Sequence, residues 1–160
     1  MLIKYITTSY GQTQKLGENF AKEIFKLPKN NTAIVLGLSG NLGGGKTTFL
    51  QGFAKGLRIE EKITSPTFVI LKKFQILNSK SQTNSKSKNF KFKTFYHFDC
   101  YRINKFEEIL ELGFKEIIKN PENIVAIEWP EKIKKALPQN LIKINFEFID
   151  KNKREINFKM

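Results

Sequence analysis

The stretch Gly40–Thr47, with the sequence GNLGGGKT, constrains the fold of this chain more than any other feature. It fits the pattern G-x-x-x-x-G-K-[ST], in which a glycine-rich loop joins a strand to a helix and binds phosphate groups. The short apolar run before it, Ile34–Leu38, predicts a buried strand. The segment after it predicts a helix because its apolar residues recur at helical spacing, at Phe49, Leu50, Phe53 and Leu57. Strand, loop and helix therefore stand in the order that the pattern requires.

The residue types of this loop suit phosphate binding. Glycines lack a Cβ atom, so consecutive backbone N–H groups can turn inward around an anion. A helix that starts near Lys46 offers its free N–H groups and the positive end of its dipole. The Lys46 ammonium can reach the β- and γ-phosphates of a nucleotide, and the Thr47 hydroxyl can ligate Mg²⁺. The alternative is a glycine-rich turn that precedes a lysine by chance, and the flanking strand and helix argue against it.

The composition predicts a single domain that comprises residues 1–160. Hydrophobic residues make up 40% of the chain, enough to form a core without metal ions or disulfides. Cys100 is the only cysteine, which excludes an intramolecular disulfide and a multi-cysteine zinc site, and we expect a reducing, cytoplasmic location. No apolar run approaches transmembrane length and the first residues do not resemble a signal peptide, so we expect no membrane association.

The net charge of +13 points toward nucleic acid as one class of partner. However, the basic residues are almost all lysines spread along the chain, and the only arginines are Arg58, Arg102 and Arg154. Arginine, with its planar guanidinium group, is the more specific indicator of phosphate recognition. We therefore interpret the charge as a lysine bias of the whole composition, without DNA binding. A basic face that meets RNA or an acidic protein is the alternative.

Two capping boxes predict where helices begin. Leu2–Thr7 is interpreted as a first strand, and Ser9 with Gln12 three residues later predicts the start of a helix that follows it. Asn104 with Glu107 predicts the start of another helix.

Antiparallel pairs of strands are predicted at two places. Phe68–Leu71 and Phe92–Phe98 are interpreted as a pair joined by a flexible hairpin insert at 75–91, because Asn78–Asn89 contains no apolar residue. Leu141–Ile149 alternates apolar and polar residues and is expected to form a C-terminal hairpin with Arg154–Phe158. The predicted fold class is α/β: a P-loop NTPase-like, three-layer fold with a mixed, mainly parallel central sheet and this C-terminal antiparallel hairpin.

A carboxylate follows a second apolar strand. Ile124–Glu128 has the character of a buried parallel strand, whose carboxyl end meets the ligand crevice of such folds. A carboxylate at this place binds Mg²⁺ or polarises the attacking water in P-loop proteins. The alternative is a strand that merely ends in a polar residue. Hydroxyl groups cluster at Thr64, Ser65 and Thr67, in a segment interpreted either as a sensor of the nucleotide state or as an ordinary loop.

Several stretches in the right order together resemble the TsaE family, the bacterial ATPases of tRNA threonylcarbamoyladenosine (t6A) synthesis. They are the phosphate loop, Thr13–Gly17, Ser65–Phe68 (SPTF), His97–Arg102 (HFDCYR), Glu111–Gly113 and Glu128–Pro130 (EWP). The resemblance implies a cytoplasmic P-loop ATPase that uses ATP and Mg²⁺ and releases ADP. It also implies partner proteins TsaD and TsaB, which transfer threonylcarbamoyl to adenosine 37 of tRNA, so that contact with tRNA is expected to be indirect.

The same resemblance implies roles for single residues. The phosphates are expected to bind at Gly43, Gly44, Gly45, Lys46, Thr47 and Thr48. Thr47 and Glu128 are expected to hold Mg²⁺, and Asp99 is expected to be a switch-like carboxylate near the γ-phosphate, so that Lys46, Asp99 and Glu128 form the catalytic set. Tyr10 and Arg154 are expected to lie near the nucleotide. The chain departs from the family in its longer, more basic insert at 75–91 and in Tyr10, where the family often has a polar residue.

Three other functions are compatible with parts of the sequence. A small-molecule or nucleotide kinase also joins a P-loop to a small α/β domain, but usually needs several arginines on a lid. A GTP-binding switch protein would carry an Asn-Lys-x-Asp stretch, and Asn152-Lys153-Arg154 is not followed by the needed carboxylate. A plain RNA-binding protein would bind RNA without nucleotide and with a strong dependence on salt.

Overall fold

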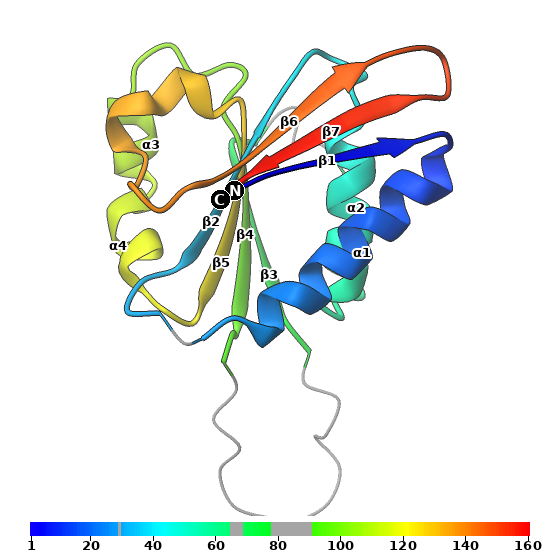
Figure 1. Cartoon of the computed structure of the whole chain (residues 1–160). Helices are drawn as coiled ribbons and strands as arrows, with labels where there is room; N and C mark the ends of the chain where they lie inside the picture. Colours follow the sequence, from blue (N-terminus) through cyan, green and yellow to red (C-terminus); the bar gives the residue numbers. More distant parts are fainter. Residues whose placement is uncertain (29, 65–68, 78–90) are drawn as a thin grey trace, which may run out of the picture.

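The computed structural model of the protein describes residues 1–28, 30–64, 69–77 and 91–160. Seven strands form one sheet, and the helices cover both of its faces (Figure 1). In chain order the elements are β1 (Leu2–Thr7), α1 (Tyr10–Lys26), β2 (Ile34–Ser39), α2 (Lys46–Gly56), β3 (Leu71–Gln75), β4 (Thr94–Asp99), α3 (Glu107–Glu111), α4 (Phe114–Lys119), β5 (Asn123–Glu128), the 3₁₀ helix η1 (Pro130–Ala136), β6 (Ile142–Phe148) and β7 (Arg154–Lys159).

The sheet is parallel in its centre and antiparallel at its edges. The strand order is β1-β7-β6-β2-β5-β4-β3, in which β6, β2, β5 and β4 pair in parallel. At one edge β3 pairs antiparallel with β4, and at the other β7 pairs antiparallel with both β6 and β1. The predicted mixed α/β fold with a C-terminal antiparallel hairpin is confirmed.

Two separate cores show that the fold has three layers. Figure 1 shows α1 and α2 on one face of the sheet and α3 and α4 on the other. Along β2, Leu36 and Leu38 belong to the core beneath α1 and α2, whereas Val35 belongs to the core beneath α3, α4 and η1. This alternation is what a strand buried on both faces requires, because successive side chains point to opposite sides of a sheet. In β5, Ala126 and Ile127 divide in the same way between the two cores.

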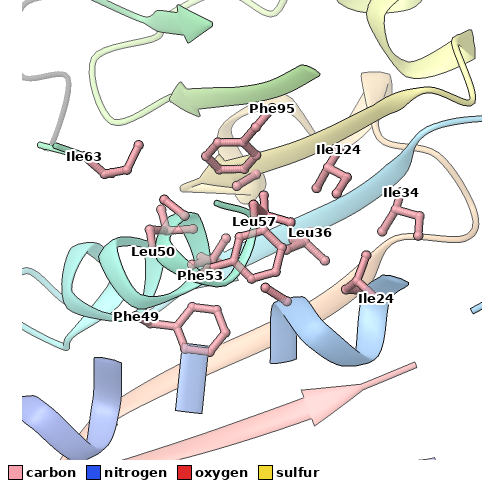
Figure 2. Close-up of a cluster of buried hydrophobic side chains, with 14 of the residues drawn as sticks. Ile24, Ile34, Leu36, Phe49, Leu50, Phe53, Leu57, Ile63, Phe95 and Ile124 are labelled. Atoms are coloured by element: carbon pink, nitrogen blue, oxygen red, sulfur yellow. The ribbon is translucent and has the colours of Figure 1, made fainter. Parts of the chain in front are cut away.

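The helix after the glycine-rich loop packs its predicted apolar face on the sheet. The four apolar side chains of this face belong to one core, in which Figure 2 shows Phe53 beside Leu36 and Phe95 of the central strands. All four are completely buried: Phe49, Leu50, Phe53 and Leu57. Burial of such a side chain stabilises a fold by about 1.5–3 kcal/mol. The packing therefore fixes the position of α2, and with it the position of the loop at its N-terminus.

Glycines let α1 approach α2 closely. A Cβ atom on Gly52 would lie 1.8 Å from the carbonyl oxygen of Gln14, and one on Gly17 would lie 2.1 Å from that of Phe49. No side chain fits at either position, so the two helix backbones touch directly. The consequence for the site is that the N-terminal turn of α1 is held beside the glycine-rich loop.

One predicted helix start is confirmed and the other is wrong. The Ser9 side chain accepts a hydrogen bond from the Gln12 N–H at the start of α1, while Gln12 Oε1 accepts from the Thr8 N–H. The second capping box does not form. Glu108, not Glu107, accepts hydrogen bonds from the N–H groups of Asn104 and Lys105. The N-cap of α3 is Phe106, so the helix begins two residues later than the pattern indicates.

The strand predicted at Phe68–Leu71 is wrong in its bounds. β3 begins at Leu71 and pairs with β4 from Leu71 opposite Phe98 to Gln75 opposite Thr94. As an edge strand it buries only Phe74 and carries lysines, which are typical of edges but break the apolar pattern. The predicted insert at 75–91 and the segment 65–68 lie almost wholly outside the described residues. Within the described ranges, no helix combines the length and the apolar character needed to cross a membrane.

Candidate functional site

A pocket of about 420 Å³ lies where the glycine-rich loop meets the carboxyl ends of β4 and β5. Its wall also includes the start of α1 and the turn between β6 and β7. All residues predicted to be catalytic, nucleotide-binding or metal-binding line this pocket: Tyr10, Gly43, Gly44, Gly45, Lys46, Thr47, Thr48, Asp99, Glu128 and Arg154. Of the hydroxyl cluster, Thr64 does not line it, and Ser65 and Thr67 lie outside the described residues. These residues come from five parts of the chain, so the fold brings together what the sequence keeps far apart.

The glycine-rich loop adopts a conformation that side chains disfavour. Gly40 has a φ of 126°, and a Cβ atom there would lie 2.2 Å from the carbonyl oxygen of Phe146. Gly45 is the N-cap of α2, with a φ of 101°, and no side chain caps this end of the helix. Because the first N–H groups of a helix have no partner within the helix, the pocket is supplied with backbone donors and with positive dipole charge.

The ammonium group of Lys46 is folded back onto the loop. Its side chain is only 5% exposed, and Nζ donates hydrogen bonds to the carbonyl oxygens of Gly40 at 2.5 Å and Asn41 at 2.9 Å. Burial lowers the pKa of Lys46 from its ordinary value, and the charges of Glu128, Glu131 and Asp99 oppose this shift. The loop therefore holds a poorly solvated ammonium group beside the site where an anion can bind.

Trp129 also contacts Lys46, with Nζ over its ring at 4.5 Å from the centroid. The backbone of Trp129 is left-handed, with a φ of 59°, which is uncommon for a bulky residue and costs about 1–3 kcal/mol. Its N–H donates to the carbonyl oxygen of Leu38, the penultimate residue of β2. The strained turn after Glu128 thus aims an aromatic ring at the lysine of the loop.

Two carboxylates lie side by side at the ends of β4 and β5. Asp99 is opposite Glu128 in the parallel register, so both side chains point to the face of the sheet that carries α2. Asp99 Oδ1 accepts a hydrogen bond from the Tyr101 N–H, and Glu128, which is 3% exposed, bonds through Oε1 to Nε2 of His97 at 2.8 Å. Both carboxylates line the pocket, as does Thr47.

Oxygen ligands of this kind suit Mg²⁺, which usually takes one or two protein ligands and completes its shell with phosphates and water. Thr47 and Glu128 supply a hydroxyl and a carboxylate in one pocket, so the donors match the predicted ion. In the described part of the chain, no three His, Cys, Asp or Glu residues cluster as a metal-binding group.

The hairpin of β6 and β7 reaches the loop through Arg154. Its guanidinium group donates to the carbonyl oxygens of Gly43 at 3.1 Å and Asp150 at 2.7 Å, and lies 4.6 Å from the centroid of the Phe148 ring. Tyr10 instead hydrogen-bonds through its hydroxyl to Gln51 of α2 and is largely exposed at the pocket mouth.

Several residues of the pocket had no predicted role. Trp129 belongs to the stretch Glu128–Pro130 that contributes to the family resemblance, but its contact with Lys46 depends on a turn that periodicity does not reveal. Lys151 and Asn152 enter the wall through the β6–β7 turn, where Asp150 accepts hydrogen bonds from the N–H groups of Asn152 and Lys153 and its pKa is thereby lowered. The run Asp150-Lys151-Asn152-Lys153 between two strands is a recognisable turn signal, but it carries no information about the pocket.

Fold and site together define a mixed α/β domain with a glycine-rich loop at a pocket beside its parallel strands. The crystal structure of YdiB from Bacillus subtilis has the same fold, with a TM-score of 0.67 and 28% sequence identity over 99% of this chain and 84% of YdiB. The family model described as threonylcarbamoyl adenosine biosynthesis protein TsaE matches residues 7–156. The chain therefore belongs to the TsaE family, as the resemblance predicted.

Proteins named tRNA threonylcarbamoyladenosine biosynthesis protein TsaE are similar to most of the chain. The one from Rickettsia felis is 38% identical over 89% of this chain and 71% of its own length. The one from Haemophilus influenzae is 31% identical over 93% of this chain and 84% of its own length. The Bacillus subtilis protein is 36% identical over 78% of this chain and 68% of its own length.

Proposed function

We propose that this protein binds ATP with Mg²⁺ and hydrolyses it to support threonylcarbamoylation of adenosine 37 in tRNA. It would do so in the cytoplasm, on a complex of TsaD and TsaB proteins, with tRNA contacted indirectly. Family membership supports the place in t6A synthesis. The observation that carries the ATPase proposal is the convergence of Lys46, Thr47, Asp99 and Glu128 in one pocket at a glycine-rich loop.

The charges of the pocket suit a polyphosphate. Among the described residues that line it, two are acidic, Asp99 and Glu128. Four are basic: Lys46, Arg102, Lys151 and Arg154. The volume is within the usual range for a small-molecule site. A triphosphate with its metal ion would balance this excess, whereas an uncharged ligand would leave it uncompensated.

The loop and Lys46 would bind the phosphates. The first N–H groups of α2 have no side-chain cap, and the glycines that precede them, Gly43 and Gly45, line the same pocket. Lys46 would exchange its two carbonyl acceptors for the β- and γ-phosphate oxygens. This exchange is favourable because a charged acceptor makes a stronger hydrogen bond than a neutral carbonyl does.

Asp99 and Glu128 would act at the end of the triphosphate. Thr47 and Glu128 would hold Mg²⁺, which when bound neutralises charge on the β- and γ-phosphates. Asp99, beside Glu128 in the register, would orient the attacking water or couple the nucleotide state to the partner surface. We expect slow hydrolysis by the protein alone, because a site that a partner completes is poorly organised without it.

The test is a reconstitution with purified protein, TsaD, TsaB and tRNA. We expect slow release of inorganic phosphate from ATP by the protein alone, faster turnover in the complex, and t6A formation that depends on both. Lys115→Ala on α4, on the face of the sheet opposite to α2, is the matched control and should behave as the wild type. Transfer of labelled γ-phosphate to a metabolite without partners would instead identify a kinase.

A further inference from the structure

His97 is the only histidine of the chain, and its imidazole ring is completely buried. It does not line the pocket, but its Nε2 lies 2.8 Å from Oε1 of Glu128, which does. Among the described residues, this is the only hydrogen-bond contact of either side chain, and Nδ1 of His97 has none. The ring therefore directs its one polar contact at a carboxylate of the candidate site.

The register of the sheet makes this contact specific. His97 in β4 lies opposite Ala126 in β5, and Glu128 is two residues further along β5 on the same face. The methyl side chain of Ala126 leaves room for the imidazole to lean along the strand toward Glu128. On its other side the ring stacks on Phe95, with centroids 6.5 Å apart and planes inclined by 17°. The neighbours thus hold the ring in one orientation.

Hydrogen-bond chemistry then fixes which group donates. An ionised carboxylate can only accept, so an ionised Glu128 requires the proton on Nε2 of His97. Nδ1 is the other ring nitrogen, and it has no hydrogen-bond partner in the described part of the chain. Packing alone does not explain a histidine here, because burial of a polar ring costs free energy unless its nitrogens are hydrogen-bonded.

We propose that His97 is a positioning residue that holds the Glu128 carboxylate in the orientation needed for the metal ion. His97 hydrogen-bonds to Oε1 of Glu128 and leaves Oε2 available to the pocket. The inference rests on the proposed function, since it assigns to His97 the alignment of an expected Mg²⁺ ligand. Residues that orient metal ligands in this way typically contribute 10–100-fold to metal affinity or activity.

Three variants separate the hydrogen bond from packing. His97→Phe keeps an aromatic ring against Phe95 but removes the donor, and should raise the Mg²⁺ concentration for half-maximal ATP binding and hydrolysis by about 10–100-fold. His97→Gln can present an N–H near the position of Nε2 and should recover most of this loss. Phe74→Leu is the matched control, because Phe74 stacks on Phe95 in the same core and its loss loosens this packing without changing a ring that contacts the polar pair, so it should leave the Mg²⁺ requirement unchanged. ATP binding measured without Mg²⁺ should be equal in all of them.

The single histidine also allows a measurement that does not depend on activity. In a ¹⁵N–¹H correlation spectrum of the imidazole ring, we expect one set of signals with the proton on Nε2. A ring protonated only on Nδ1 would overturn the inference, as would a folded His97→Phe variant with the Mg²⁺ requirement of the wild type. If the wild type itself neither binds nor hydrolyses Mg²⁺-ATP, the proposed function fails and the inference falls with it. If the wild type is active and only the histidine results disagree, the positioning role alone is refuted.

Discussion

The ammonium group of Lys46 lies 4.5 Å from the centroid of the Trp129 ring, so the lysine of the glycine-rich loop rests against the only tryptophan of the chain. A cation over the face of an indole is attracted by about 0.5–2 kcal/mol, depending on how far it is desolvated. Here the lysine is 5% exposed and also donates to two carbonyl oxygens. Any ligand that recruits the ammonium must therefore change the surroundings of the indole ring.

The first prediction follows from this contact. Addition of ATP should change the fluorescence of Trp129 in a saturable way, because the phosphates would draw Lys46 away from the ring. AMP, which lacks the β- and γ-phosphates, should give a much smaller change. A titration that shows ATP binding by equilibrium dialysis without any fluorescence change would contradict this placement of Lys46.

The second prediction concerns Lys46→Ala. Loss of a donor that stabilises charge in the transition state typically lowers turnover by about 100–1,000-fold, and we expect a loss of this size in ATP hydrolysis. The fold should be retained, because the variant removes an incompletely solvated charge rather than an apolar contact. Phosphate release and thermal unfolding measure the two effects, with Lys115→Ala as the control. Turnover equal to that of the wild type would refute the assignment of the loop.

The third prediction compares two glycines of the helices. Gly52→Ala should destabilise the protein by several kcal/mol, at least about 3, because its Cβ would lie 1.8 Å from the Gln14 carbonyl oxygen and would force α1 from α2. Gly11→Ala, where a Cβ would meet nothing within 4 Å, should stabilise the protein by about 0.5–1 kcal/mol through helix propensity. Chemical denaturation of both variants checks the contrast, and equal effects would contradict the close packing of α1 on α2.

The fourth prediction concerns the pH dependence of stability. Burial raises the pKa of the Cys100 thiol from 9.0 to about 12. Because the unfolded thiol ionises first, the contribution of Cys100 to stability is complete below pH 9 and declines as the pH rises toward about 12. Unfolding free energies of wild type and Cys100→Ala should therefore converge over this range. In native protein at pH 8 the thiol should also resist alkylation by iodoacetamide, and rapid alkylation would contradict its burial.

Much of this architecture could be predicted because it depends on local patterns. The run before the loop, the helical spacing after it and the alternation of β6 each report a periodicity that burial imposes. The bounds of β3 could not be predicted, since an edge strand with one buried residue, Phe74, lacks that periodicity. The contacts of His97 with Glu128 and of Lys46 with Trp129 depend on strand register and on one left-handed residue, which are tertiary properties. The resemblance identified the stretches involved, but not these contacts.

The last prediction concerns Asp99, which lies opposite Glu128 at the carboxyl ends of β4 and β5. Its backbone N–H donates to Ile70 of the segment that leads into β3, and its Oδ1 accepts from the N–H of Tyr101, which is exposed at the pocket. Asp99 therefore connects the end of the proposed triphosphate site to two segments at the surface. A residue so placed can report the nucleotide state to a partner without holding the phosphates itself.

We accordingly expect Asp99→Ala to bind ATP within about threefold of the wild type, because the loop and Lys46 are intact, but to lose the difference in partner affinity between the ATP and ADP states. Coupling requires such a differential affinity, so t6A formation in the reconstituted complex should be lost with it. Binding of TsaD and TsaB to the protein is measured in each nucleotide state, with Glu23→Ala, an exposed residue of α1 outside the pocket, as the carboxylate control. If Asp99→Ala kept the wild-type difference in partner affinity and lost only hydrolysis, Asp99 would act on the water alone, and the coupling would have to pass through Glu128 and the turn at Trp129.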